Sequence, residues 1–227
     1  MDTASDFRIL VAEDALGRLE GVVRNRRLSL PVNWGRAQDV LRGIRSRLLR
    51  VKYMYLPARQ LAALPELREI REMSVELARL LLDKEALRKF RPDPVVVAET
   101  RYALRILYGL RNRLLFGDDN NPLYAIDIEG VLVVSVRKHP GADKLYVTKA
   151  EGALPYDIVT NISDIKKGEI RAAAILPPAV IMGVLSEAMY CSGPIPGEYK
   201  ARRPPEDLIY RDEVVSKIYM IVERLKR

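Results

Sequence analysis

The chain has 227 residues, of which 48% are hydrophobic and 30% are charged, and its formal net charge is +8. One cysteine, Cys191, and one histidine, His139, exclude an internal disulfide and a zinc cluster built from thiolates or imidazoles. The polar start MDTASDFR does not have the pattern of a signal peptide, and no apolar run reaches the roughly 18 residues of a membrane helix. We therefore expect a soluble, cytoplasmic protein with no metal, no cofactor and no membrane partner.

The cationic excess is confined to the first half of the chain. Residues 1–116 hold 23 Lys and Arg against 14 Asp and Glu, whereas residues 117–227 hold 15 against 16. The densest segment is 24–59, where ten cations accompany a single acid, Asp39. An acidic partner such as a nucleic acid would accordingly meet the upstream half.

Residues 1–116 predict an all-α domain. The first helix runs from Phe7 to Val23, with Asp6 or Ser5 as its N-cap. The second runs from the N-cap Asn33 to about Tyr55, because Pro57 cannot continue it. Its apolar residues form one stripe: Ala37, Val40, Leu41, Ile44, Leu48, Val51 and Tyr55.

Two longer helices complete this domain. The third is predicted from Pro65 to about Phe90, with Leu67, Ile70, Leu77 and Leu81 inward and Glu66, Glu69, Glu72 and Glu76 outward. The fourth has Asp93 as N-cap and Pro94 at its first position, and it runs to about Phe116. Its apolar residues lie nearly all round the helix, so we place it centrally.

The segment 117–122, GDDNNP, contains six turn-forming residues and marks a domain boundary. After it, alternating and apolar runs predict five short strands, with a tight turn at residues 139–143 where Pro140 and Gly141 reverse the chain. Five short strands within about 60 residues are typical of a small closed barrel of the oligonucleotide-binding (OB) type. The fold class is therefore α+β: a helical domain over 1–116, an OB-fold barrel over 123–193 and a C-terminal amphipathic helix over 206–227.

Three motifs in the barrel segment carry a resemblance to a known family. HPGADKLYV at 139–147, IVTN at 158–161 and LPPAVIMGVLSEAM at 176–189 are similar to the tRNA-binding domain family. That family includes the C-terminal appendix of many methionyl-tRNA synthetases, the endothelial monocyte-activating polypeptide domain and small dimeric chaperone-like relatives. The resemblance covers about residues 128–193. It implies an OB-fold, tRNA as a partner, and contacts from Lys144 and Ser186.

The second family motif departs from its tRNA-binding form. Where that form carries two lysines, an arginine and a glutamine, this chain has Pro177, Val180, Met182 and Glu187. Phosphate contacts from cations supply most of the non-specific affinity for nucleic acids. We therefore expect the barrel to bind RNA poorly by itself.

The cationic second helix has two interpretations. In the first, its guanidinium groups grip phosphates and Trp34 stacks on a base. In the second, the arginines form ion pairs with Glu66, Glu69, Glu72 and Glu76 of the next helix. The candidate RNA-binding residues are Arg36, Arg42, Arg45, Arg47, Arg50, Lys52 and Trp34, together with Lys144 and Ser186 of the barrel.

Other reactive residues have structural explanations. We interpret His139 as a turn residue, Cys191 as a core residue, Asp143 as a cap for backbone donors, and Asp118 and Asp119 as solvated linker residues. Ser186 and Met189 have the alternative roles of fixing a loop and filling the core. No phosphate-binding glycine loop and no catalytic triad order is present, so we do not expect an enzyme.

The last helix has an apolar stripe that must be covered by its own barrel, by the helical domain or by another subunit. Its members are Val214, Ile218, Ile221, Val222 and Leu225. The sequence as a whole predicts a non-catalytic RNA-binding protein, with tRNA or another structured RNA as its partner. The alternative is a protein-interaction module, either a homodimer or a scaffold for an aminoacyl-tRNA synthetase.

Overall fold

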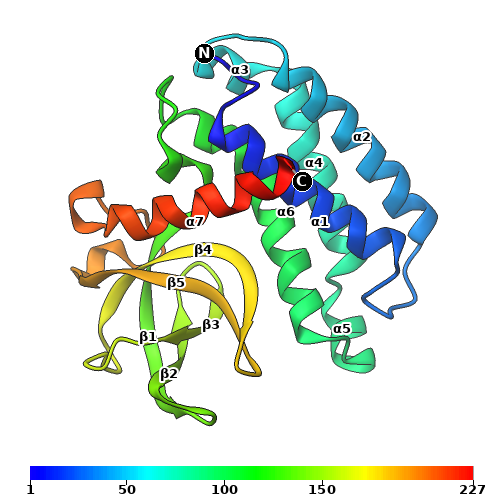
Figure 1. The fold of residues 1–227 in the computed structure, drawn as a ribbon. Coiled ribbons are helices and arrows are strands. Elements are labelled where there is room, and N and C mark those ends of the chain that lie inside the picture. The colour runs from blue at the N-terminus through cyan, green and yellow to red at the C-terminus, as the bar shows by residue number, and fades with distance from the viewer. Residues whose placement is uncertain (227) are drawn as a thin grey trace. The chain divides into compact units, whose positions relative to one another are not determined.

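The computed structural model describes residues 1–226, and it confirms the α+β class with helices first, then five strands, then a helix (Figure 1). The chain divides into two compact units, which are described separately. The helical unit comprises residues 1–125 and the C-terminal segment from Ile218, and the sheet unit comprises Ile126–Lys217.

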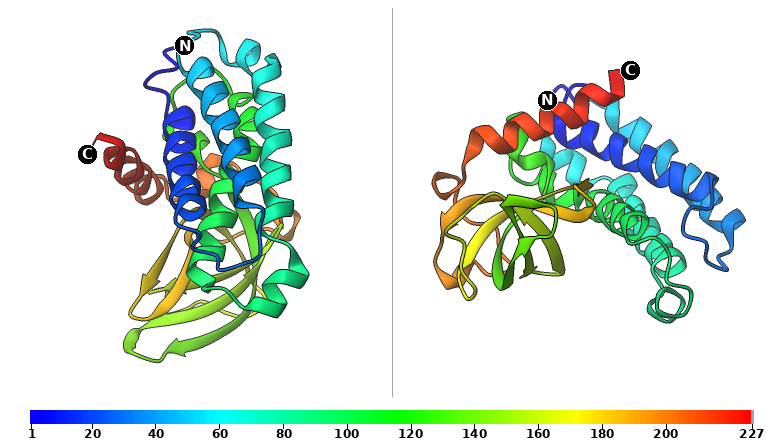
Figure 2. Two further views of the ribbon diagram at one scale, coloured as in Figure 1. Left: turned by 90° about the vertical axis from the view of Figure 1, so that its right-hand side faces the viewer. Right: turned by 60° about the horizontal axis from the view of Figure 1, so that its bottom comes forward.

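The helical unit is built on four long helices. These are α1 (Phe7–Arg24), α2 (Trp34–Lys52), α4 (Pro65–Leu81) and α6 (Pro94–Leu114), and two short helices, α3 (Ala58–Ala63) and α5 (Lys84–Phe90), accompany them. Each long helix packs against two of the others (Figure 2). The predicted N-caps are confirmed: the side chains of Asp6, Asn33 and Asp93 accept hydrogen bonds from the first turns of α1, α2 and α6.

The predicted apolar stripes form the core of this unit. On α2, Ala37, Val40, Leu41, Ile44, Leu48 and Val51 are buried, and on α4 the four residues predicted inward are buried. Tyr55 is an error of the prediction, because α2 ends at Lys52 and Tyr55 lies beyond it with a φ of 52° and an exposed ring. The opposite face of α2 therefore carries the polar residues.

One further prediction about the helices is wrong. The single helix from Pro65 to Phe90 is two helices, because the Asp83 side chain accepts a hydrogen bond from Ala86 N at 2.8 Å and starts α5 as its N-cap. Asp118 is exposed, as predicted for a linker residue, and its Oδ1 also accepts a hydrogen bond from Ala58 N at 2.5 Å, at the start of α3. The N-cap of α3, Pro57, has no side-chain acceptor of its own, which explains why a distant carboxylate serves.

The sheet unit contains five antiparallel strands in the order β3-β2-β1-β4-β5. They are β1 (Ile128–His139), β2 (Ala142–Glu151), β3 (Pro155–Thr160), β4 (Ile170–Ile181) and β5 (Val184–Pro194). The predicted turn is confirmed at Pro140 and Gly141, between β1 and β2. His139 has the structural role expected of it, because its Nδ1 accepts a hydrogen bond from Gly141 N and its Nε2 donates to Ile181 O, both at 3.0 Å.

The sheet is open in its backbone pairing, since β3 and β5 are its two edges. Side chains of β5 nevertheless reach the backbone of β3. Val159 N donates to the Ser186 hydroxyl at 3.0 Å, and Asp157 N donates to Glu187 Oε2 at 3.1 Å. The barrel predicted from sequence is thus joined at this edge by side chains instead of a strand ladder.

Cys191 lies on β5 with no exposed surface, as predicted for a core residue. Burial raises the pKa of its thiol to about 12. The neighbouring Tyr190 is also buried, and burial raises the pKa of its phenol to about 12 while Thr148 hydrogen-bonds its hydroxyl at 2.9 Å. Both groups are neutral in the folded protein at physiological pH.

The C-terminal helix α7 (Arg211–Glu223) starts in the sheet unit and ends in the helical unit. Its stripe residues Val214, Ile218, Ile221 and Val222 are buried within the chain, whereas Leu225 is exposed. The Tyr219 ring meets the Phe7 ring of α1 edge-on, with 5.1 Å between centroids. The stripe is therefore covered by the chain itself. None of the helices that the structure describes has the length and apolarity required to cross a bilayer.

Candidate nucleic-acid interface

The six cations of α2 proposed for RNA binding, here called the α2 face, are all ion-paired. Their partners come from α1, α2 itself and α4. The pairs are Arg36–Glu76 (2.5 Å), Arg42–Asp39, Arg45–Glu20, Arg47–Glu69, Arg50–Glu66 (3.8 Å) and Lys52–Glu13 (2.8 Å). Six cations thus meet six carboxylates, and the face carries little net charge.

The predicted ion-pair network with α4 is present for three of its four acids. Glu66, Glu69 and Glu76 bind α2 arginines, while Glu72 pairs with Arg68 of its own helix at 3.8 Å. The hydrogen bond that Arg36 donates to Glu76 raises the pKa of Arg36, and the one that Arg45 donates to Glu20 raises the pKa of Arg45. Each of these guanidinium groups already has a carboxylate partner, which a phosphate would have to displace.

A second group of cations, here called the cationic end, lies where α1 ends and where α4 passes into α5. Figures 1 and 2 show the α1–α2 connection and α5 at the same end of the helical unit. Its members are Arg24, Arg26, Arg79, Lys84, Arg88, Lys89 and Arg91, all exposed. Within residues 1–226, none of the seven is in an ion pair.

The acids beside the cationic end form no ion pair with its cations within residues 1–226. Asp83 and Asp93 accept hydrogen bonds from the first turns of α5 and α6 and so act as helix caps. Glu85 is exposed in the first turn of α5, where a carboxylate suits the helix dipole. The cations Arg88, Lys89 and Arg91 gather at the opposite end of that short helix.

Residues 1–117 match the family model described as "Alpha helical domain". The match covers more than half of the 227 residues. The chain belongs to this family. No curated protein matches the chain. The family description gives an architecture without an activity, so functional inference rests on the residues of the alpha helical domain and of the sheet.

Two arginines of the alpha helical domain's cationic end have left-handed backbone conformations. Arg26 has a φ of 49° and Arg91 a φ of 45°, and Arg91 is the C-cap of α5. Glycine is the usual residue at such a position, because a side chain there costs about 1–2 kcal/mol. Both positions carry a long cation instead, at a cost to stability.

The remaining predicted contacts are divided between the two units. Trp34 is the first residue of α2 and is half-buried, on the same helix as the paired arginines. Lys144 is exposed on β2, and no described carboxylate pairs with it. Ser186 is buried: its hydroxyl accepts from Val159 N and donates to Ala188 O. Its hydrogen bonds hold the sheet together, so Ser186 lacks the surface that a direct RNA contact needs.

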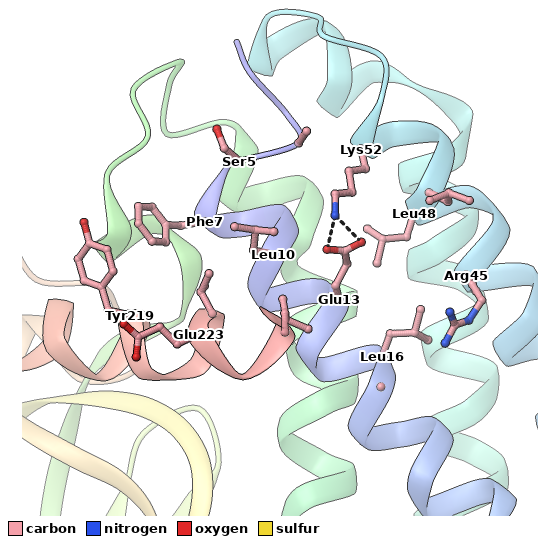
Figure 3. A pocket seen from close by; sticks show the side chains of 15 residues that line it. Ser5, Phe7, Leu10, Glu13, Leu16, Arg45, Leu48, Lys52, Tyr219 and Glu223 are labelled. Atoms are coloured by element: carbon pink, nitrogen blue, oxygen red, sulfur yellow. Dashed lines mark hydrogen bonds and ion pairs between the residues drawn. The ribbon is translucent and has the colours of Figure 1, made fainter. Parts of the chain in front are cut away.

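The helical unit also contains a groove of about 910 Å³ between α1, α2 and the C-terminal segment. Figure 3 shows the rings of Phe7 and Tyr219 at one side and the Lys52–Glu13 ion pair at another. Leu10, Leu16, Leu48, Leu49, Val222 and Leu225 supply most of the remaining lining. The groove offers contact to apolar groups. Among residues 1–226, no group of three or more potential ligand side chains is placed to hold a metal ion.

The candidates drawn from the sequence were the cations of α2, and they left out the more available cations of the cationic end, of which Arg24 and Arg26 lie in the segment 24–59. The segment 24–59 has the larger excess, but its neighbours α1 and α4 contribute carboxylates from outside the segment. The signal that points to the cationic end is the short run RKFR at 88–91, in which no acid is present. A charge count within one helix cannot reveal partners that come from another helix.

Proposed function

We propose that this protein is a non-catalytic RNA-binding protein whose phosphate contacts come from the cationic end of the alpha helical domain. The observation that carries the proposal is the contrast in pairing: seven exposed cations lack carboxylate partners there, whereas all six cations of the α2 face have one. Unpaired guanidinium groups bind phosphate without first breaking an ion pair.

The binding energy in this proposal is electrostatic. Each phosphate neutralised by Lys or Arg releases condensed counterions, so affinity falls with rising salt. Arg24, Arg26, Arg88 and Arg91 present planar forks that match phosphate oxygens, and Lys84 and Lys89 add point charges. Such contacts fix position without reading sequence.

Structured RNA, with tRNA as the leading candidate, is supported by the resemblance of the sheet unit to the tRNA-binding domain family. The five-stranded antiparallel sheet and the hydrogen bonds that the β3 backbone donates to β5 side chains agree with the small barrel that this resemblance implies. Lys144 is the exposed cation retained from the family motif. In this proposal the sheet contributes shape recognition, and an aminoacyl-tRNA synthetase is a candidate protein partner.

The test measures affinity for unmodified tRNA between 50 and 200 mM salt for three proteins. The wild type is compared with a cationic-end variant (Arg88→Glu, Lys89→Glu, Arg91→Glu) and an α2-face variant (Arg45→Glu, Arg47→Glu, Lys52→Glu), which change the net charge equally. We expect the cationic-end variant to lose at least about tenfold in affinity, because three phosphate contacts disappear and the salt dependence flattens. The α2-face variant should lose less.

Two results contradict the proposal. If the wild type shows no binding at the lowest salt, the protein does not bind RNA through cations. If the two variants lose equally, the effect reports net charge alone, and the cationic end has no special role.

A protein-interaction module is the second candidate function, and the apolar groove of Figure 3 favours it. Leu49 and Leu225, at this groove, are exposed. Burying such side chains against another protein yields roughly 25 cal/mol for each Å² of apolar surface. Sedimentation of the purified wild type and of Leu49→Glu, with and without nuclease, tests self-association through this groove. A monomer under all conditions excludes the homodimer.

A further inference from the structure

We propose that the cationic end binds unpaired nucleotides, with Phe90 as the surface on which a base stacks; this inference rests on the proposed RNA-binding function. Phe90 is the last residue of α5, and 45% of it is exposed. It is flanked by Arg88, Lys89 and Arg91 of the cationic end. The three phenylalanines of the chain have different surroundings.

Phe90 is the phenylalanine whose ring is left available. Phe7 meets Tyr219 edge-on, and Phe116 meets Tyr124 with 5.0 Å between ring centroids. Within residues 1–226, Phe90 has no aromatic partner. Its ring is instead approached by Lys89 Nζ, 5.4 Å from the centroid. A flat apolar face bordered by cations is the surface that nucleobases stack on while their phosphates are held.

The helix that carries Phe90 adds nothing to the core. None of the residues of α5 is buried, in contrast to α1, α2, α4 and α6. The residue that follows Phe90, Arg91, takes a left-handed conformation that glycine would adopt without strain. The segment therefore buries no residue and ends in a strained conformation, yet it keeps an exposed ring beside three cations. These features fit a surface that contacts a ligand.

The stacking role sets the class of RNA. In a duplex the bases are stacked on one another, so a side chain on the protein surface reaches phosphates and sugars but no base face. Unpaired nucleotides in a loop or at an end expose that face. The cationic end alone would bind both forms, whereas Phe90 would add affinity only for the unpaired form.

The experiment compares a 12-nucleotide adenine-rich single strand with a 12-base-pair RNA duplex by fluorescence anisotropy at one salt concentration. Phe90→Ala should weaken binding of the single strand by about tenfold, because stacking on an aromatic side chain is lost, and should change duplex binding by less than about twofold. Arg79→Ala provides the control, since it removes a cation from the same end and should weaken both ligands alike.

A fluorescent variant gives a second, independent readout. Phe90→Trp in a Trp34→Phe background places the only tryptophan at the proposed platform. Stacking of a base on this indole should quench its emission with the single strand and leave it unchanged with the duplex.

The outcomes separate this inference from the function on which it rests. Equal effects of Phe90→Ala on both RNAs, or no effect on either, overturn the stacking role while RNA binding stands. A wild-type protein that binds neither RNA overturns the proposed function and the stacking role together.

Discussion

The α2 face and the cationic end are both rich in arginine, but they differ in whether their cations form ion pairs. Every cation of the α2 face meets a carboxylate from α1, α2 or α4, and Arg47 and Lys52 are less than a third exposed. At the cationic end, Lys84, Arg88 and Lys89 lie on α5, a short helix that buries none of its residues. Cations within a packed bundle find partners because neighbouring helices supply them, and cations at its end remain available to a ligand.

The largest expected difference between the two regions is in stability. The α2-face triple variant breaks three ion pairs and places glutamates beside Glu20, Glu69 and Glu13. Ion pairs at a protein surface contribute about 0–1 kcal/mol each, so we expect a loss of up to about 3 kcal/mol in the free energy of unfolding. The cationic-end triple variant should stay within about 0.5 kcal/mol of the wild type.

Urea unfolding followed by circular dichroism measures both values. Equal stability losses in the two variants would remove the distinction on which the comparison depends, since they would mean that the cationic end also has carboxylate partners in solution.

A rise in pH should lower the stability of the sheet unit, which contains Cys191. The α2 face and the cationic end both belong to the helical unit. The Cys191 pKa is raised from 9.0 to about 12 by burial, so the unfolded chain releases this proton at a lower pH than the folded one. The contribution of the protonated Cys191 thiol to the free energy of unfolding is therefore fully present below pH 9. Above pH 9 it falls, by at most about 1.4 kcal/mol for each pH unit.

Thermal unfolding between pH 8 and pH 10 tests this dependence, with Cys191→Ala as the comparison. The variant begins less stable because a buried side chain is shortened, but its stability should fall less steeply with pH. An identical slope in both proteins would show that Cys191 is not the titrating group.

Arg91→Gly should show whether the Arg91 side chain serves RNA binding or the stability of the fold. Relief of the left-handed strain, offset by the greater flexibility of glycine, predicts a gain of about 0.5–1 kcal/mol in the free energy of unfolding. The same change should weaken tRNA binding. Melting and anisotropy measurements on one preparation give both values, and a loss of stability would show that Arg91 makes a folding contact instead.

The smallest expected effect is that of Lys144→Ala. This cation is exposed on β2, in a sheet unit whose family motif has lost its other cations, so we expect less than about a twofold change in tRNA affinity. A filter-binding assay is sufficient to detect a larger loss. Such a loss would move the main RNA contact to the sheet and away from the cationic end.

The fold was largely predictable from local patterns. The caps Asp6, Asn33 and Asp93 and the stripe of α2 followed from helix periodicity, and the turn at Pro140 followed from backbone chemistry. The break between α4 and α5 was missed because the apolar spacing continues across it, while the cap Asp83 competes locally for backbone donors.

The sequence predicted the type of residue in the candidate site, exposed cations, but not where in the fold the available ones lie. Helical spacing identified arginines that face away from the core, and it could not show that Glu13 and Glu20 approach from α1, more than 20 residues earlier in the chain. The role of Asp118 was missed for the same reason, because Ala58 lies 60 positions before it. Electrostatic availability depends on tertiary neighbours, which periodicity does not encode.

The path of α7 gives the sheet an unusual connection to the rest of the protein. The polypeptide leaves the helical unit after Ala125 and re-enters it at Ile218, so the sheet is an insertion held by two covalent strands of chain. A single protease cut at either junction would leave the other intact. A unit connected at both of its ends has less conformational freedom than a unit connected at one end.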